Sequence, residues 1–179
     1  MQICAFRFWK GGEVIKQLIL INGAMGAGKT AVCNELLGML RPGVFLDGDW
    51  CWNMDPFIVT DETKLMVEKN IIYMLRNFLM CSEYKNIIFC WVMHQESIIA
   101  GILDGLSDLG FEKHIFTLTI SKETLTRRLA KDVDRGERTP DVIGRSVARL
   151  AMYDKMDTEK IDVSDITARQ AAGIIAASL

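Results

Sequence analysis

The sequence predicts an α/β fold in which a five-stranded, mostly parallel sheet lies between two layers of helices. Short runs rich in Val, Ile, Leu and Phe alternate five times with segments of helical spacing. The run at 86–92 is continuously apolar, as in strands that are buried on both faces of a parallel sheet. The 179 residues suit one domain, so we expect the whole of 1–179 to form it.

The first predicted elements are a strand at 18–22, a glycine-rich turn and a helix at about 29–40. Arg41-Pro42-Gly43 ends this helix, because proline cannot continue the backbone hydrogen bonds and glycine suits the exit. A short strand at 44–46 then leads into Asp47-Gly48-Asp49. The preceding segment is harder to assign, and it predicts either an extra edge strand or an extension outside the fold, over residues 1–16.

The middle of the chain predicts a helix, a buried strand and a second helix. Thr60 is a suitable N-cap for a helix that ends near Cys81. The strand at 86–92 is followed by a helix at 97–109, which stops at Gly110. The last third predicts a strand at 113–120, a helix that Ser121 caps and that reaches about Lys131, and a charged loop at 132–139. A helix then opens at Thr139 and runs past Tyr153, and it is followed by a strand at 160–163 and a final helix capped by Ser164 or Asp165.

A phosphate-binding motif joins the first strand to the first helix. Gly23, Gly28, Lys29 and Thr30 match G-x-x-x-x-G-K-[ST] at each fixed position. Glycines let successive N–H groups turn inward, and the helix N-terminus adds positive partial charge, so the loop attracts phosphate. Lys29 is expected to reach the β- and γ-phosphates of ATP, and the Thr30 hydroxyl to bind Mg²⁺. The expected nucleotide-binding residues are Gly23, Ala24, Met25, Gly26, Ala27, Gly28, Lys29, Thr30 and Ala31.

Two carboxylates follow the second predicted strand, at the edge of the sheet where ligands bind. Asp47 and Asp49 point the same way if the strand continues, because side-chain direction alternates along a strand. One carboxylate could accept the proton of an attacking hydroxyl while the other supports Mg²⁺. The alternative is an ordinary Asp-Gly turn.

The segment Val44–Trp50 resembles the LDGD segment of gluconate kinases and adenylylsulfate kinases, which are small-molecule P-loop kinases. The wider group includes shikimate kinase and chloramphenicol phosphotransferase. The resemblance covers most of the chain in layout, and it implies a three-layer P-loop NTPase fold with strand order 2-3-1-4-5. It also implies that Asp49 orients or deprotonates the acceptor hydroxyl, with Asp47 the second candidate and a metal ligand. Trp50-Cys51-Trp52-Asn53 replaces the histidine-containing stretch of gluconate kinases, which argues against gluconate as the acceptor.

A basic segment is similar to the lid of the same kinases. Its basic residues are Arg127, Arg128, Lys131, Arg135, Arg138, Arg145 and Arg149. The resemblance implies a small lid at about 127–139, with Arg128 at its root beside adenine and with Arg135 and Arg138 contacting phosphate. Guanidinium groups suit this task because they bind phosphoryl oxygens bidentately and neutralise transition-state charge. The alternative is a solvated face whose arginines pair with nearby acidic residues.

Further residues near the expected site have open assignments. His94 follows the strand at 86–92, where it would either touch substrate or make structural hydrogen bonds. Trp50, Trp52 and Phe57 would either wall an acceptor pocket or pack in the core and over the sheet edge.

The composition excludes several classes of protein. The net charge of −2 argues against a mainly electrostatic nucleic-acid binder. The five cysteines form no C-x-x-C pair, so neither a disulfide framework nor a zinc site is expected. No apolar run approaches the ~20 residues of a membrane span, and we predict a cytoplasmic protein that does not bind membranes.

The leading prediction is an ATP-dependent kinase of a small-molecule acceptor, active as a monomer or homodimer. A nucleoside monophosphate kinase is the close alternative, since it shares the loop and the lid. A further alternative is a module that binds ATP without catalysing a reaction. A GTP switch is disfavoured because the sequence has no Asn-Lys-x-Asp guanine motif.

Overall fold

The computed structural model describes residues 15–179, so most of the predicted N-terminal strand or extension at 1–16 lies outside them. Five strands form one sheet whose neighbours all run parallel, in the order β2-β3-β1-β4-β5. Both the predicted strand number and the predicted order are confirmed. The strands are β1 (Gln17–Gly23), β2 (Gly43–Asp47), β3 (Asn86–Cys90), β4 (Glu112–Thr119) and β5 (Glu159–Asp162).

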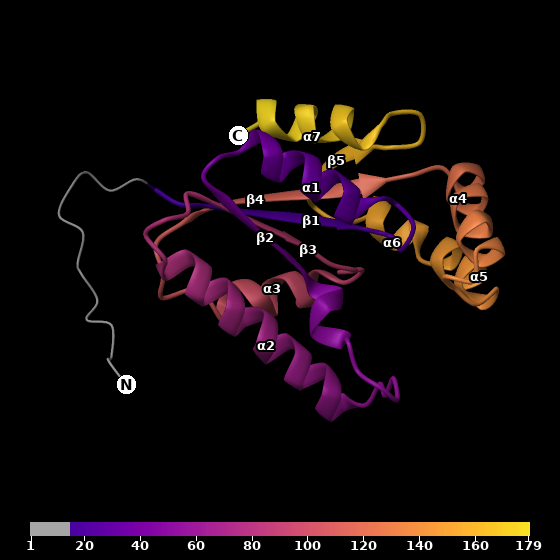
Figure 1. Ribbon diagram of the computed structural model, residues 1–179, viewed down its shortest axis with the longest axis horizontal. Coiled ribbons are helices and arrows are strands. Elements are labelled where there is room, and N and C mark those ends of the chain that lie inside the picture. Colours follow the sequence, from indigo (N-terminus) through magenta and orange to yellow (C-terminus); the bar gives the residue numbers. More distant parts are fainter. Residues whose placement is uncertain (1–14) are drawn as a thin grey trace.

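Helices cover both faces of the sheet (Figure 1). One face carries α1 (Lys29–Met39) and α7 (Ala168–Ala177), and the other carries α2 (Asp61–Met80) and α3 (Glu96–Asp104). Beyond the carboxyl ends of the strands lie two further helices, α4 (Lys122–Asp134) and α5 (Asp141–Ala148). Two short helices complete the fold, the 3-10 helix η1 (Gly48–Trp52) and α6 (Leu150–Asp154).

The core lies where the central strands meet the two helical layers. Residues 18–21 of β1 are fully buried, and Ile19 pairs in register with Ile88 of β3 and His114 of β4. Both faces of β1 are covered by helices, so the side chains at 18–21 are buried on either face, and all four are apolar. This strand therefore holds the start of the phosphate-binding loop rigidly at the carboxyl edge of the sheet.

Several predicted boundaries are wrong. Helix α4 continues to Asp134 instead of ending near Lys131. The single helix expected at 139–153 is divided at Arg149, whose backbone N–H donates to Ser146 O, three residues back, so the α-helical ladder is interrupted. The strand expected at 86–92 ends at Cys90, and the helix after it begins at Glu96.

The cap of the last helix also differs from the prediction. Thr167, and neither Ser164 nor Asp165, caps α7, and Thr167 and Gln170 form a reciprocal capping box. Ser164 instead accepts a hydrogen bond from the Ser121 N–H at 2.8 Å. A serine near the start of a helix can therefore accept a hydrogen bond from the end of a neighbouring strand instead of capping the helix. The local sequence does not show which of the two bonds forms.

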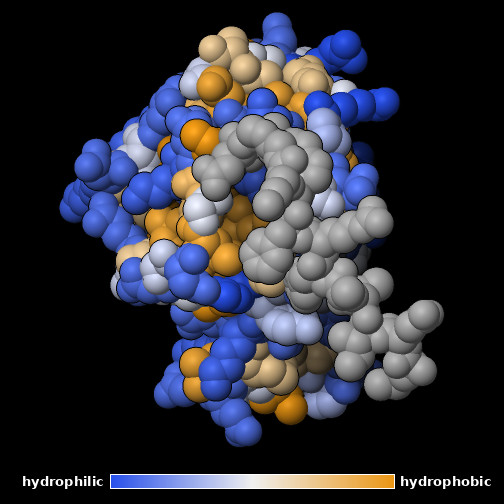
Figure 2. Space-filling model, turned by 90° about the vertical axis from the view of Figure 1, so that its left-hand side faces the viewer, coloured by the Kyte–Doolittle hydropathy of each residue, from blue (hydrophilic) through white to orange (hydrophobic). Residues whose placement is uncertain are grey.

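The edge opposite the site is where the strands begin. Figure 2 shows this side, where hydrophilic side chains alternate with apolar areas. Within residues 15–179, no helix combines the length and the apolar character that crossing a bilayer requires. The residues of the candidate site lie at the opposite edge of the sheet, where the strands end.

Candidate active site

The phosphate-binding loop has the backbone that its glycines allow. Gly26 and Gly28 have φ of 85° and 96°, in the left-handed region that favours glycine. Gly26 is constrained by packing as well, because a Cβ there would lie 2.7 Å from Cδ2 of Leu129 on α4. The loop is therefore pressed against α4 at Gly26 and opens into α1 at Gly28.

Lys29 points back into this loop. Its ammonium group donates hydrogen bonds to the carbonyl oxygens of Gly23 and Ala24 at 3.0 and 3.1 Å. The residue is 9% exposed, and this burial lowers the pKa of Lys29, while nearby acidic groups including Asp49 and Asp47 act in the opposite direction. An incoming phosphate would offer the ammonium group a stronger, charged acceptor than the two carbonyls.

Thr30 and Asp47 meet directly at the start of α1. The Thr30 hydroxyl donates to Asp47 Oδ2 at 2.6 Å, although the two residues come from different elements. Asp47 is buried, and its Oδ1 accepts a hydrogen bond from the Asp49 N–H at 3.0 Å, which caps η1. A hydroxyl and a carboxylate side by side are the oxygen ligands that Mg²⁺ uses beside nucleotide phosphates, so these residues fit that ion. In the described part of the chain, no group of three or more His, Cys, Asp and Glu residues is arranged to hold a metal ion.

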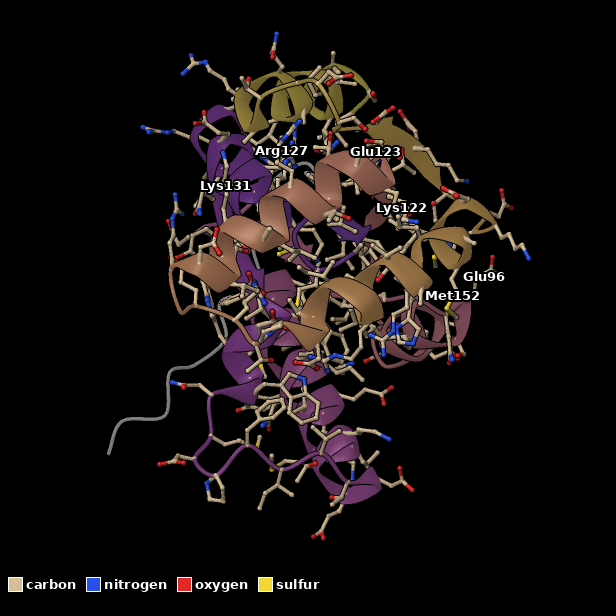
Figure 3. The ribbon with its side chains drawn as sticks, turned by 90° about the vertical axis from the view of Figure 1, so that its right-hand side faces the viewer. Glu96, Lys122, Glu123, Arg127, Lys131 and Met152 are labelled. Carbon is tan, nitrogen blue, oxygen red and sulfur yellow. The ribbon has the colours of Figure 1, made fainter. Side chains whose placement is uncertain are left out.

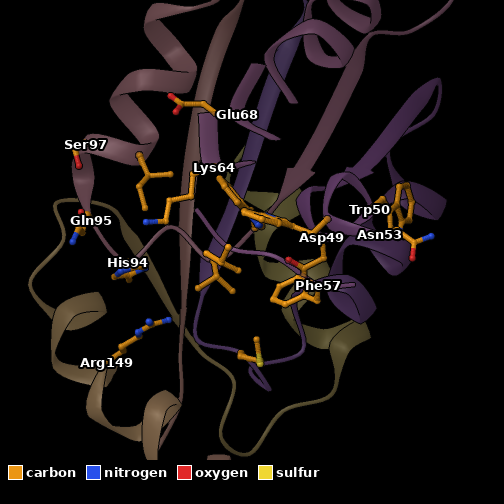
Figure 4. A pocket seen from close by; sticks show the side chains of 16 residues that line it. Asp49, Trp50, Asn53, Phe57, Lys64, Glu68, His94, Gln95, Ser97 and Arg149 are labelled. Carbon is orange, nitrogen blue, oxygen red and sulfur yellow. The ribbon is translucent and has the colours of Figure 1, made fainter. Parts of the chain in front are cut away.

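Asp49 lies on η1 and faces a large cavity (Figure 4). Partial burial raises the pKa of Asp49, and the neighbouring Asp47 carboxylate raises it further. Three neighbours oppose this shift: the charges of Lys29 and Arg138, and a hydrogen bond from the Trp91 side chain. The result is a carboxylate with increased proton affinity that faces the cavity.

Trp91 determines how closely η1 approaches the sheet. It directly follows β3, and its backbone N–H donates to Ile21 O at 3.3 Å. A Cβ on Gly48 would lie only 2.5 Å from Cγ of Trp91 and 2.9 Å from its Cβ, both near the backbone of that residue. Glycine at position 48 thus leaves the room that the Trp91 side chain occupies beside η1.

We expect Gly48→Ala to lower the free energy of unfolding by about 1–3 kcal/mol, because Trp91 or η1 must move to admit the methyl group. The same movement would displace Asp49, so acceptor turnover should fall as well. Gly38→Ala is the matched control, because a Cβ at Gly38 meets nothing within 4 Å and helix propensity favours alanine there. Chemical denaturation of both variants provides the comparison, and equal stabilities would contradict the packing argument.

The cavity beside Asp49 has a volume of about 1100 Å³. Much of its wall is apolar and comes from the loop after β2 and from the segment after β3: Trp50, Trp52, Phe57, Val59, Trp91, Val92 and Ile98. Met25 of the phosphate-binding loop also lines it, so the cavity adjoins the expected phosphate site. The structure therefore places Trp50, Trp52 and Phe57 in a pocket wall, and Trp52 also packs against the hydrophobic core, so both kinds of contact that the sequence left open are present.

Polar side chains occupy other parts of the same wall (Figure 4). His94 and Arg149 lie beside each other there, and burial together with the Arg149 charge lowers the pKa of His94. His94 Nδ1 is buried without a hydrogen-bond partner. Arg149 makes no ion pair within residues 15–179, and it also lines a small cleft beside Ala24 and Tyr153. The wall thus presents an imidazole and a guanidinium group to the cavity.

The arginines that were predicted to form the lid occupy different environments. Arg128 donates to Ala27 O at 3.1 Å and to Val163 O at 2.7 Å, so it ties α4 to the phosphate-binding loop and to the end of β5. Arg138 pairs with Asp132 at 3.2 Å, and its charge acts on Asp49. Arg135 is exposed at the end of α4. Figure 3 shows Arg127 on the side of α4 that faces away from α5.

The fold thus brings together most of the residues that the sequence indicated. Hydrogen bonds join Thr30, Asp47 and Asp49, and the charge of Lys29 acts on Asp49. Arg135 makes no hydrogen bond or ion pair to these residues in the described part of the chain. The sequence predicted that Trp91 lies at the carboxyl edge of the sheet and that Arg149 reaches inward from its helix, but it gave neither residue a role in lining a pocket. Trp91 carried a usable signal, since an aromatic residue directly after a buried strand must lie at the carboxyl edge.

Comparison with solved structures shows which known proteins share this fold. Of the solved structures that match, a tunicamycin resistance protein from Deinococcus radiodurans has a TM-score of 0.69 and 23% identity, with 91% of this chain and 95% of that chain covered. A gluconokinase from Sinorhizobium meliloti has a TM-score of 0.63 and 15% identity, covering 92% and 95%. Shikimate kinase from Acinetobacter baumannii has a TM-score of 0.59 and 20% identity, covering 90% and 91%.

These structural similarities establish a common fold, the P-loop fold that kinases use. The search of curated proteins finds no match. The family model for the AAA domain, AAA_18, matches residues 19–163, which run from β1 to the end of β5 and contain the phosphate-binding loop, both aspartates and the basic segment. The chain therefore belongs to the AAA domain family AAA_18, and it has the fold of the P-loop kinases.

Proposed function

We propose that this protein is an ATP-dependent phosphotransferase that acts on a hydroxyl group of a small-molecule acceptor. The position of Asp49 carries the proposal. Its carboxylate interacts electrostatically with the Lys29 ammonium group, and it also lines the cavity of about 1100 Å³. A group that handles a proton is thus located where a phosphate site and an acceptor site adjoin.

The donor side follows from the phosphate-binding loop. ATP would place its β- and γ-phosphates among the N–H groups of residues 23–30, and Lys29 would exchange its two carbonyl partners for phosphate oxygens. Thr30 and Asp47 would hold Mg²⁺, which neutralises phosphate charge when it is bound. Asp47 also fixes η1 through the Asp49 N–H, so the metal site and the acceptor site share one carboxylate.

The acceptor side follows from Asp49. The acceptor hydroxyl oxygen forms a bond to the γ-phosphorus while the bond from that phosphorus to the bridging oxygen breaks, and ADP leaves. Asp49 orients the hydroxyl and takes its proton. The raised pKa of Asp49 suits this task, since a stronger base accepts the proton more readily. Arg138 acts on Asp49 electrostatically and is the lid arginine best placed to contact transferred phosphate.

The names of the structural neighbours support this class of reaction. The shikimate kinase structure is described as a complex with shikimate. The Mycobacterium tuberculosis APS kinase, with a TM-score of 0.64 and 12% identity, is described as a complex with AMPPNP and APS. Proteins with this fold thus bind small-molecule acceptors and a nucleotide analogue, which supports a nucleotide donor and a small-molecule acceptor for this protein.

An ATP-consumption screen tests the proposal. The purified protein would be incubated with Mg-ATP and, separately, with sugars, nucleosides, nucleoside monophosphates and larger hydroxylated compounds. ADP formation that depends on one acceptor, with matching phosphorylated product in the mass spectrum, is the expected result. Acceptor-independent ATP hydrolysis across the whole panel would contradict the proposal, and strong turnover of nucleoside monophosphates alone would favour the nucleotide kinase.

Amide hydrogen exchange in residues 127–139 is expected to slow when a non-hydrolysable ATP analogue binds. The segment from Arg135 to Thr139 is exposed, and Arg138 is held by a single pair to Asp132, so little buried apolar contact opposes its opening. Phosphate would give its arginines new partners and order the turn. Exchange in α7, which lies outside this segment and packs against α1, serves as the internal reference, and unchanged exchange in 127–139 would count against a lid.

A further inference from the structure

We infer that the acceptor carries a planar, apolar ring system joined to the part that bears its reactive hydroxyl, an inference that rests on the proposed function. The aromatic wall beside Asp49 would bind the ring, and Asp49 would receive the hydroxyl. This assigns a chemical class to the acceptor that neither the family nor the fold specifies.

The size of the cavity is the first argument. Pockets of ~300–1,000 Å³ bind drug-sized ligands, and the cavity here, about 1100 Å³, is at or above that range. A six-carbon sugar acid or a similar small polyol would leave most of this space to water. Tight and oriented binding requires that most of the ligand surface be covered, so the cavity fits a larger acceptor.

The exposure of the wall is the second argument. Phe57 is 67% exposed and Trp50 is 57% exposed, although both line the cavity. Neither residue is buried: Trp50 contacts the core through Phe45, and core packing does not account for the exposed area of either ring. Large aromatic side chains that gather around a cavity mark a surface that gains free energy when an apolar ligand covers it.

The geometry of the rings is the third argument. Trp52 and Phe57 lie with their ring centroids 5.8 Å apart and tilted by 51°. Trp50 packs edge-on against Phe45 of β2, with centroids 5.3 Å apart, which holds the start of this wall against the sheet. A third ring in the ligand can join such a set by offset or edge-to-face contact, the arrangements that aromatic groups prefer.

The chain connects this wall to the chemistry. Asp49, Trp50 and Trp52 all belong to η1, a helix of five residues whose cap is the Asp47 carboxylate. A ring held by Trp52 and Phe57 therefore lies close to the carboxylate that orients the hydroxyl. His94 and Arg149 line another side of the same cavity, where they can bind polar substituents of the acceptor (Figure 4).

A series of matched glucosides tests the inference by binding alone. Methyl, phenyl and 4-methylumbelliferyl β-D-glucoside share the same sugar hydroxyls and differ in the area of the attached ring. Each is titrated by calorimetry into protein saturated with a non-hydrolysable ATP analogue, so that the donor site is filled. Affinity should rise in the order methyl, phenyl, 4-methylumbelliferyl, by at least about tenfold from first to last.

Two variants locate the binding. Phe57→Ala should remove most of the advantage of the ring-bearing probes, whereas Tyr73→Ala should leave it intact, because Tyr73 is equally exposed at 68% but does not line the cavity. Equal affinity for methyl and 4-methylumbelliferyl glucoside, or no binding of either ring-bearing probe up to millimolar concentration, would overturn the inference. Ring-dependent binding in a protein that forms no ADP with any acceptor would support the pocket assignment and contradict the kinase.

Discussion

Lys29→Ala is expected to reduce ATP turnover by at least about 10²–10³-fold while the protein remains folded. The ammonium group is the cation within the phosphate-binding loop, and without it the charge that develops during phosphoryl transfer has no fixed partner there. In the free protein the group binds only the Gly23 and Ala24 carbonyls, from a buried position that already lowers its pKa. Removing the ammonium group loses two hydrogen bonds, which lowers the free energy of unfolding, and it also removes a buried charge, which raises it.

The measurement pairs turnover with thermal unfolding. Without ligand, Lys29→Ala should melt close to the parent protein, and the upward shift of the melting temperature that Mg-ATP causes in the parent should be smaller or lost. Lys122→Ala is the control, because Lys122 is an exposed lysine on α4 (Figure 3) and its loss should change neither quantity. Turnover that survives in Lys29→Ala would remove the phosphate-binding loop from the mechanism.

Asp49→Asn is expected to slow acceptor-dependent turnover by at least ~10²-fold and to leave the affinity for Mg-ATP almost unchanged. The substitution keeps the size of the side chain and removes its charge and basicity. Because desolvation and Asp47 raise the pKa of Asp49, the charged form is disfavoured in the folded protein. The asparagine variant should therefore be at least as stable as the parent at neutral pH, so a loss of turnover could not be ascribed to unfolding.

The pH dependence of turnover gives a second readout for Asp49. The group acts in its ionised form, which is lost when the pH falls through its pKa. Because the pKa of Asp49 is raised, acceptor turnover should begin to fall at a higher pH than it would if the group were an aspartate with an ordinary pKa. The acidic limb of the profile should be missing from the residual activity of Asp49→Asn. An identical limb in both proteins would assign it to another group, and full activity in the variant would move the acceptor site away from Asp49.

Asp47→Asn is the contrasting variant. Its Oδ1 can still cap η1, since an amide oxygen accepts the Asp49 N–H as a carboxylate oxygen does. The negative charge beside Thr30 is lost, so the Mg²⁺ concentration needed for half-maximal activity should rise by about tenfold or more. A change in Mg²⁺ dependence in Asp47→Asn but not in Asp49→Asn would separate the two carboxylates by function. The same change in both would contradict the assignment.

The sequence by itself determined the fold and the donor loop. Leu18–Ile21, the glycine motif and the five strand–helix alternations each depend on local properties, namely continuous apolar character, freedom of φ and helical spacing. Such properties are visible in a short window, and together they predicted a mostly parallel sheet of five strands, whereas the order of the strands followed from the resemblance to P-loop kinases. Both are confirmed. The assignments of Lys29 and Thr30 rest on the glycine motif, and those of Asp47 and Asp49 rest on their place after a strand and on the LDGD resemblance. The roles of all four stay predictions for the experiments above.

Only the tertiary structure decided what surrounds Asp49. Trp91, His94 and Arg149 are 42 or more positions away from it along the chain, yet they line the same cavity because β3 lies beside β2 and the end of α5 reaches the carboxyl edge. The use of Arg128 to tie the phosphate-binding loop to Val163, and of Ser164 to bind Ser121 instead of capping α7, was likewise settled by partners distant in sequence. Side-chain pairing across elements depends on how the elements pack, and no local pattern encodes that packing.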